Sequence, residues 1–161
     1  MSHPLGEAFF QELLWVHGMI RQDLETVREL AQRVTDGLSA DELSSELRSL
    51  KANGSLWALK VNCLHYCRFV HGHHRLEDVA LFPALRAADP DIAPVVDRLE
   101  ADHRVVAAQL EEIEAAVAAE AQARVIAALD ALADHLLEHL AFEEENIGPT
   151  LRRMDRHPLW S

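Results

Sequence analysis

The segment HHRLEDVALFP, residues 73–83, contains a histidine followed four positions later by a glutamate. The segment HLAFEEENIGP, residues 139–149, repeats this spacing, and in both segments a proline comes ten positions after the first histidine. Side chains four residues apart lie on the same face of an α-helix. The two segments therefore predict two helices that each present an imidazole and a carboxylate together: His73 with Glu77, and His139 with Glu143.

The surrounding sequence has the periodicity of helices packed in a bundle. Leu13, His17, Ile20 and Leu24, for example, recur at spacings of four, three and four. Turn-forming residues punctuate the pattern at Asp36-Gly37, Asn53-Gly54-Ser55, Asp89-Pro90 and Gly148-Pro149. Helices are expected over about residues 7–35, 55–88, 91–119 and 122–147, with a short extra helix over about 40–52. We predict an all-α, antiparallel up-and-down four-helix bundle, a single domain over residues 1–161 with its core at about 7–152.

Two further histidines occupy inward positions on the first and third predicted helices, at His17 and His103. At about 1.5 Å of rise per residue, both fall at the height of the two histidine–glutamate pairs. A lone core histidine is usually hydrogen-bonded, and each glutamate could pair with its own histidine. Those separate explanations do not account for six polar core positions in one layer. Imidazole and carboxylate groups suit transition metals, so the layer predicts a metal site in which each carboxylate could bridge two ions.

Several neighbouring residues have less certain roles in the pattern. His74 lies about 100° round the helix from the adjacent histidine, where it is either a fifth metal ligand or a solvated edge residue. For His135 we expect a supporting or packing role, and for Tyr66 a core position or a pocket wall. Cys63 and Cys67 are one turn apart, a spacing that rarely permits a disulfide, and we expect them to be reduced.

Composition limits the kinds of partner that this chain can bind. The formal net charge is −12, which disfavours nucleic acid and anionic membrane surfaces. No stretch approaches the roughly 20 apolar residues that span a bilayer, and no signal peptide is recognisable. We therefore expect a cytoplasmic protein that binds neither nucleic acid nor membrane. No acid–base pair or nucleophile stands out apart from the candidate ligands.

In these residues the chain resembles the hemerythrin-like family, also called HHE cation-binding domains, over roughly residues 10–152. The resemblance rests on His17, on His73-His74-x-x-Glu77-Asp78 followed by Leu81-Phe82-Pro83, on Asp102-His103, and on His139-x-x-x-Glu143 followed by Pro149. It implies an up-and-down bundle around two non-haem iron ions joined by an oxo or hydroxo bridge. Carried over, one iron would take His17 and His73, the other would take His74, His103 and His139, and Glu77 and Glu143 would bridge.

The chain departs from the oxygen-carrying members of that family at two ligand positions and in the extra helix expected over about 40–52. Those carriers place a third histidine of the second iron on the third helix, where this chain has Ala107, so His74 would have to replace it. Their last carboxylate is an aspartate five residues after the histidine, whereas Glu143 comes after four.

The implied ligand count leaves one position open on the iron held by His17 and His73. An open position is where a small ligand binds. The expected function is therefore the binding or sensing of oxygen, nitric oxide or peroxide. Two alternatives remain: an enzyme that consumes peroxide or reduces oxygen, and a protein that buffers iron or holds metal structurally.

Overall fold

The computed structural model describes residues 2–39 and 45–159, and every regular element in those residues is helical. The all-helical class expected from the periodicity is therefore confirmed. The elements are α1 (Pro4–Ser39), α2 (Ser45–Leu76), the π-helical turn η1 (Glu77–Leu81), α3 (Phe82–Ala88), the 3₁₀ turn η2 (Pro90–Ile92), α4 (Ala93–Ala118) and α5 (Gln122–Arg153).

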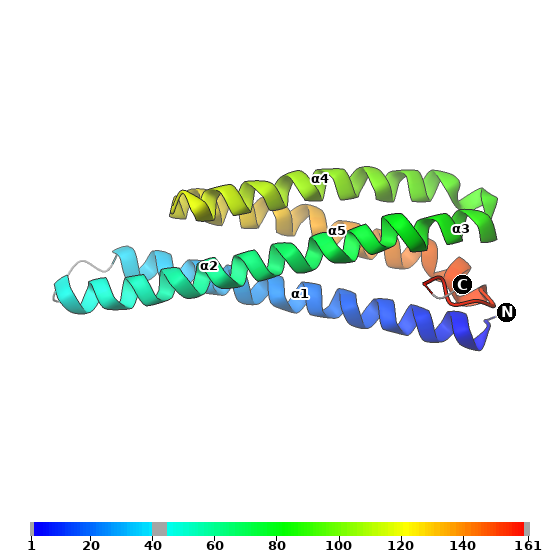
Figure 1. The fold of residues 1–161 in the computed structure, drawn as a ribbon, viewed down its shortest axis with the longest axis horizontal. Coiled ribbons are helices and arrows are strands. Elements are labelled where there is room, and N and C mark those ends of the chain that lie inside the picture. The colour runs from blue at the N-terminus through cyan, green and yellow to red at the C-terminus, as the bar shows by residue number, and fades with distance from the viewer. Residues whose placement is uncertain (1, 40–44, 160–161) are drawn as a thin grey trace.

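Four long helices lie side by side in an elongated bundle (Figure 1). The chain runs along α1 and returns along α2, then runs out again along α4 and returns along α5. Helix α1 packs against α2 and α5, and α4 packs against the same two helices. Every long helix thus has two neighbours, and the side chains that point inward from all four share one interior.

The loop region between the first two long helices differs from the sequence expectation. Residues 45–52 are not a separate helix but the first turns of α2, which continues through Asn53-Gly54-Ser55 without a break. The rest of the expected short helix, residues 40–44, lies outside the described residues. Asparagine and glycine each cost a helix about 1 kcal/mol or less, which lowers helical preference without forbidding the conformation.

The expected end of α5 at Gly148-Pro149 is wrong, because the helix continues to Arg153. A Cβ atom on Gly148 would lie 3.1 Å from ring atoms of Phe10 on α1. The glycine therefore permits a close approach of α1 to α5 and does not terminate the helix. Pro149 removes one backbone hydrogen bond and its ring crowds the carbonyl four residues earlier, yet α5 continues through it. Helix α1 likewise passes the expected stop at Asp36-Gly37 and ends at Ser39.

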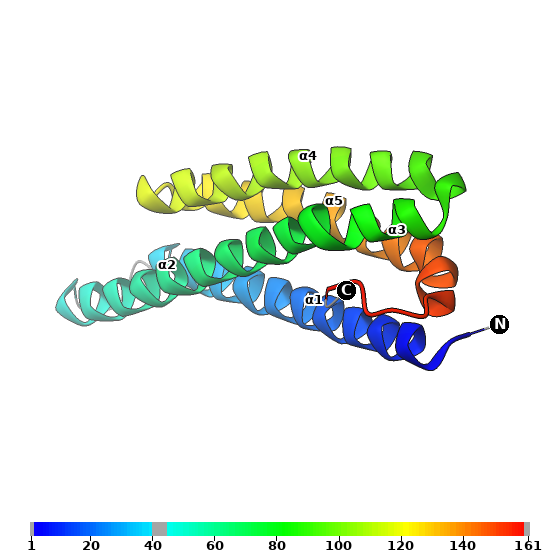
Figure 2. The same ribbon diagram turned by 45° about the vertical axis from the view of Figure 1, so that its right-hand side comes forward.

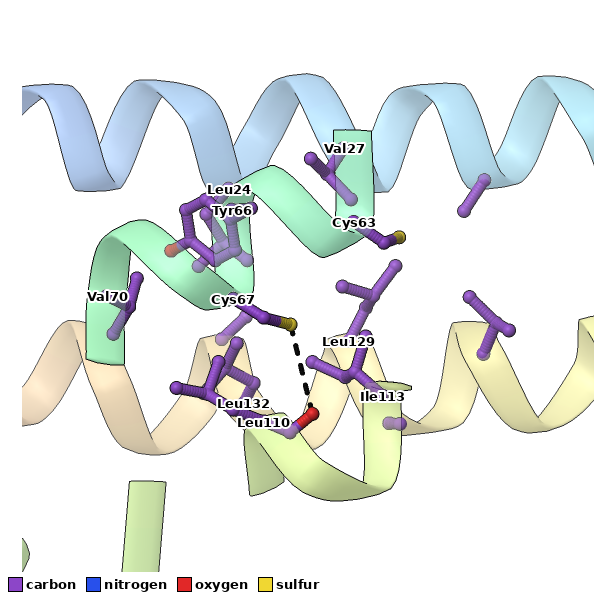
Figure 3. Packing of buried hydrophobic residues seen from close by; sticks show 14 of the residues in the cluster. Leu24, Val27, Cys63, Tyr66, Cys67, Val70, Leu110, Ile113, Leu129 and Leu132 are labelled. Atoms are coloured by element: carbon purple, nitrogen blue, oxygen red, sulfur yellow. Dashed lines mark hydrogen bonds between the residues drawn. The ribbon is translucent and has the colours of Figure 1, made fainter. Parts of the chain in front are cut away.

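The apolar core is divided into two clusters. The larger cluster includes Ile20, Val70, Val106 and Leu136, and Figure 3 shows part of it. The smaller cluster is formed by Phe9, Leu13, Leu81, Phe82, Leu85, Ile92, Val96, Leu99, Ile147 and Leu151. On α1, α4 and the α2–η1 segment, the buried polar residues lie between the members of one cluster and those of the other.

Both cysteines belong to the larger cluster. Cys63 and Cys67 are buried and free, and the Cys67 thiol points at the Leu110 carbonyl oxygen at 3.8 Å (Figure 3). Tyr66 is also buried there, and its hydroxyl donates to the Ile20 carbonyl oxygen at 3.2 Å. The core position expected for Tyr66 is what the structure shows, and the two cysteines are buried beside it. No helix among the described residues is long and apolar enough to cross a membrane.

Candidate metal centre

The structure brings all seven expected site residues together in one buried layer. Helix α1 supplies His17, the end of α2 supplies His73 and His74, and η1 supplies Glu77. Helix α4 contributes His103, and α5 contributes His139 and Glu143. None of the seven side chains is more than a tenth exposed to solvent. Each long helix of the bundle therefore contributes at least one side chain to the same small volume.

Glu77 stands between imidazoles of three helices. Its Oε1 atom lies 3.4 Å from Nε2 of His73 and 3.3 Å from Nε2 of His103. Its Oε2 atom lies 4.0 Å from Nε2 of His17. One carboxylate therefore faces the histidines at both ends of the site.

Glu143 has the equivalent position on the opposite side. Its Oε1 atom lies 3.8 Å from Nε2 of His17, and its Oε2 atom lies 3.3 Å from Nε2 of His139. The two carboxylates thus face the same pair of histidine groups from different helices. Their placement agrees with the bridging roles that the family resemblance implies.

His74 is buried and is not the solvated edge residue that was the alternative for it. Its ring stacks on His103 at 3.8 Å between centroids, with 10° between the planes, and lies 5.2 Å from the ring of His139. One potential ligand atom from each of these three histidines and from Glu77 lies within 4.8 Å of the others. His74 therefore belongs to the end of the layer that contains His103 and His139.

The other end of the layer contains His17 and His73. Their rings meet edge to face at 5.1 Å between centroids, and their ligand atoms lie within 4.8 Å of one another and of a Glu77 oxygen. The two groups of donors share the Glu77 carboxylate.

The inner atoms of this layer lack hydrogen-bond partners. The Nε2 atoms of all five histidines, and both oxygens of each glutamate, are buried and have no hydrogen-bond partner in the described structure. A buried polar group without a partner costs about 1–3 kcal/mol, and a charged one costs more. So many unsatisfied atoms pointing at one volume are what a bound cation resolves. The residues present therefore fit a metal centre.

Three of the five histidines are held in the neutral form that binds metal. Burial lowers the pKa of His73 to about 4 and that of His103 to about 3, with neighbouring imidazoles adding to the shift. Burial and nearby imidazoles also lower the pKa of His74. At neutral pH these rings are uncharged, and each keeps a nitrogen lone pair available for coordination.

Burial affects the two glutamates differently because their neighbours differ. Burial and the adjacent Glu143 carboxylate raise the pKa of Glu77 well above its usual range. Burial acts in the same direction on Glu143, but Glu77 and His139 outweigh it and hold the pKa of Glu143 below its usual range. Of the two carboxylates, Glu77 is therefore the one whose protonated form this environment favours.

Three carboxylates outside the layer lie against the outward-facing Nδ1 atoms of three of its histidines. The Nδ1 atom of His17 lies 2.8 Å from Glu144, that of His103 lies 2.8 Å from Asp78, and that of His139 lies 3.1 Å from Asp102. A carboxylate at Nδ1 keeps the proton on that nitrogen and directs the Nε2 lone pair inward. These contacts fix both the tautomer and the orientation of the rings.

Sequence periodicity missed these supports because it places Asp78 and Glu144 outside the inward stripe. A signal is nevertheless present, since each supporting carboxylate immediately adjoins a candidate ligand in the sequence. Asp78 follows Glu77, Asp102 precedes His103, and Glu144 follows Glu143. A residue one position along is about 100° round the helix and therefore points toward the neighbouring helix.

The helix around Glu77 is not regular. Residues Glu77–Leu81 form a π-helical turn, in which Phe82 donates its N–H to the Glu77 carbonyl oxygen five residues earlier. Pro83 follows directly and has no N–H to donate to Val79, so an ordinary α-helical bond is absent at this point. Such π-turns often occur at functional sites because they change the direction in which nearby side chains point.

His135 lies beside the centre. Its Nε2 atom is 3.7 Å from Asp102, the carboxylate that supports His139, and about a quarter of its side chain is exposed. This position agrees with the supporting role expected for it and does not bring it into the group of inward-facing nitrogens.

Comparison with known proteins agrees with this geometry. The model of the hemerythrin HHE cation binding domain matches residues 9–151, which include all seven site residues and their three supporting carboxylates. No curated protein and no solved structure gives a significant match.

Proposed function

Because the chain belongs to the hemerythrin HHE cation-binding domain family, we propose that it is a non-haem di-iron protein that binds or senses a small oxidant. Family membership and the buried histidine–glutamate cluster together identify a metal-binding domain, and iron is the typical ion of this family. The number of ions, their oxo or hydroxo bridge and the oxidant are the parts that we propose. Oxygen, nitric oxide and peroxide are the candidate ligands.

The proposed assignment divides the donors as the structure groups them. One ion would take His17 and His73, and the other would take His74, His103 and His139. Glu77 and Glu143 would bridge. The observation that carries this proposal is the set of buried nitrogens and oxygens that face one another without hydrogen-bond partners.

Charge supports two cations in preference to one. Burial favours the neutral form of His73, His74 and His103, and the two carboxylates would bring two negative charges into a volume closed to solvent. A buried carboxylate is stable only when it is paired or bound to metal. Two ions placed between the carboxylates would neutralise both and would occupy both groups of histidines.

The distribution of donors also supports a ligand-binding role. The His74 end has three imidazoles and the His17 end has two, so the His17 ion would have a coordination position to spare. A reduced pair of irons, when bound, supplies electrons to a ligand at such a position. The chain itself holds the donors rigidly: Glu144 and Arg21 anchor His17, with Arg21 donating to Glu144 at 2.7 and 3.0 Å.

A cytoplasmic location is part of this proposal. Cys63 and Cys67 are free thiols buried in the core, as in proteins of reducing compartments. No binding of nucleic acid or membrane is proposed, because nothing in the charge or the fold favours it.

Metal analysis with absorption spectroscopy tests the proposal. We expect two irons per chain and an oxo-bridge absorption band that changes when the reduced protein meets oxygen or nitric oxide. Glu77→Ala should lose both the second iron and the band, whereas Glu25→Ala, an exposed glutamate on α1, should keep both. Bound zinc, or a single weakly held ion with no ligand-dependent spectrum, would contradict the proposal.

A measurement of peroxide turnover distinguishes the enzymatic alternative from the binding or sensing role. If the iron-loaded protein consumes many equivalents of peroxide and Glu77→Ala does not, the domain is a di-iron enzyme. Stoichiometric binding without turnover supports the binding or sensing role.

A further inference from the structure

A small cavity opens beside one end of the metal centre. It has a volume of about 110 Å³, and His73 and Glu77 form part of its wall. The remaining wall comes from α1, from the α2–η1 segment and from the C-terminal segment, and it is apolar except for Glu12. No residue of the His74, His103 and His139 group lines it. The cavity therefore adjoins the end of the centre that has fewer imidazoles.

The volume and the apolar lining of this cavity determine which molecules it can hold. A cavity of about 150 Å³ lined by apolar groups holds a benzene molecule or a xenon atom, so the smaller volume here suits molecules of a few atoms. An apolar wall favours uncharged molecules, because an ion entering it loses its hydration. The Glu12 carboxylate and the net charge of −12 further oppose an anion.

One side of the wall is formed by Leu159, which lies on the segment Met154–Leu159. This segment follows the end of α5 and runs back along α1 (Figure 2). Leu159 lines the cavity and packs, half-buried, against the smaller apolar cluster. The His157 ring meets Phe9 edge to face at 4.7 Å between centroids, and its Nε2 atom lies 3.4 Å from Glu12. The Leu159 N–H donates to Nδ1 of His157 at 3.2 Å.

These contacts attach the segment to α1 less firmly than the helices are attached to one another. The segment has no regular secondary structure, Asp155 and Arg156 within it are exposed, and its ion pair involves a Glu12 side chain that is 65% exposed. Exposed ion pairs contribute little to stability, so the segment is held largely by apolar contacts. Met154 and Leu159 pack against the smaller cluster, and of the segment only Leu159 lines the cavity.

We propose that Leu159 is a specificity-determining residue that closes the cavity and admits only small, uncharged molecules to the centre. The inference rests on the proposed function for its biological meaning, since it concerns access to an open metal position. The cavity and its wall are nevertheless properties of the chain alone. The proposal can therefore be tested whether or not iron is the bound ion.

Xenon binding tests the cavity without any metal chemistry. Crystals of the metal-free protein under xenon pressure should show one xenon site beside His73 and Glu77. Leu159→Trp should fill the cavity and remove that site. Leu64→Ala, an exposed leucine on α2 remote from the cavity, is the matched control and should keep it. Absence of xenon beside His73 in the unchanged protein, or its persistence in Leu159→Trp, would overturn the proposal.

The rates at which charged and uncharged ligands bind test whether Leu159 selects between them. In the metal-loaded protein Leu159→Ala should speed the binding of azide, an anion, on the order of tenfold, and should speed that of nitric oxide less. Leu159→Trp should slow both, and Leu64→Ala should change neither. Equal rates in Leu159→Ala and Leu64→Ala would overturn the proposal. A preparation that binds no iron contradicts the proposed function alone, because the xenon result still decides the role of Leu159.

Discussion

The run Glu143-Glu144-Glu145 on α5 offers a sharp test of the site, because three consecutive identical residues are expected to have three different roles. Glu143 faces the centre, Glu144 supports His17 from behind, and Glu145 is exposed to solvent. The three positions share the same starting residue, the same helix and nearly the same local sequence, and each can be replaced by alanine in turn. Differences in metal affinity then report position alone.

The expected magnitudes follow from the contacts. Glu144 lies 2.8 Å from Nδ1 of His17, and removal of such a supporting carboxylate typically weakens metal affinity about 10- to 100-fold, or about 1.4–2.7 kcal/mol. Glu144→Ala should show this loss at the His17 end only. Glu143→Ala removes a candidate ligand and should cost more than 100-fold at both ends. Glu145→Ala should leave affinity unchanged.

Competition against a chelator of known affinity, followed by metal analysis, measures all three variants. Circular dichroism and thermal unfolding of the metal-free proteins serve as the control, since a variant that unfolds would lose metal for an unrelated reason. Glu144→Gln adds a further comparison, because its amide oxygen can still accept from His17 but carries no charge. Equal affinities for Glu144→Ala and Glu145→Ala in folded proteins would refute the supporting role.

Three further predictions concern the whole fold. Metal at 100 times its dissociation constant should stabilise the folded protein by about 2.7 kcal/mol per independent site, and removal by a chelator should lower the melting temperature accordingly. Burial raises the pKa of Cys63 to about 11 and that of Cys67 to about 12, so at pH 8.5 the folded protein should resist iodoacetamide, which should label both thiols after unfolding. In α1, Gly6→Ala would place a Cβ against the Leu151 carbonyl oxygen and should destabilise the protein by about 1–3 kcal/mol in urea unfolding. Gly18→Ala meets nothing within 4 Å and should stabilise it by up to about 1 kcal/mol, so equal effects of the two glycine substitutions would contradict the packing at this end of the bundle.

The layer of donors could be anticipated from sequence because it depends on regular geometry. A constant rise per residue places His17, His73, His103 and His139 at one height once the helices are known, and polar residues in apolar stripes are conspicuous. The position of His74 could not be derived in that way. Its burial depends on where the neighbouring helix lies, and helical periodicity contains no information about that distance.

Helix ends were harder to anticipate because glycine and proline have more than one use. At Gly148 the missing side chain accommodates the ring of Phe10, which comes from a helix more than a hundred residues away in the sequence. The same residue next to Pro149 is typical of a helix end when only local preference is considered. At Asn53-Gly54 a modest local penalty likewise did not end α2.

The three supporting carboxylates have a consequence for how this site could change during evolution or be rebuilt in another bundle. Asp78 in η1 supports a histidine on α4, Asp102 on α4 supports one on α5, and Glu144 on α5 supports one on α1. Each of these segments thus carries both an inward-facing donor and the anchor for a donor on the next helix. A donor cannot be moved without its anchor, which belongs to a different segment of the chain. Each supported histidine and its carboxylate are therefore expected to change together during evolution. Grafting only the seven inward residues onto another scaffold should leave the imidazole rings without a fixed orientation and should give weak metal affinity.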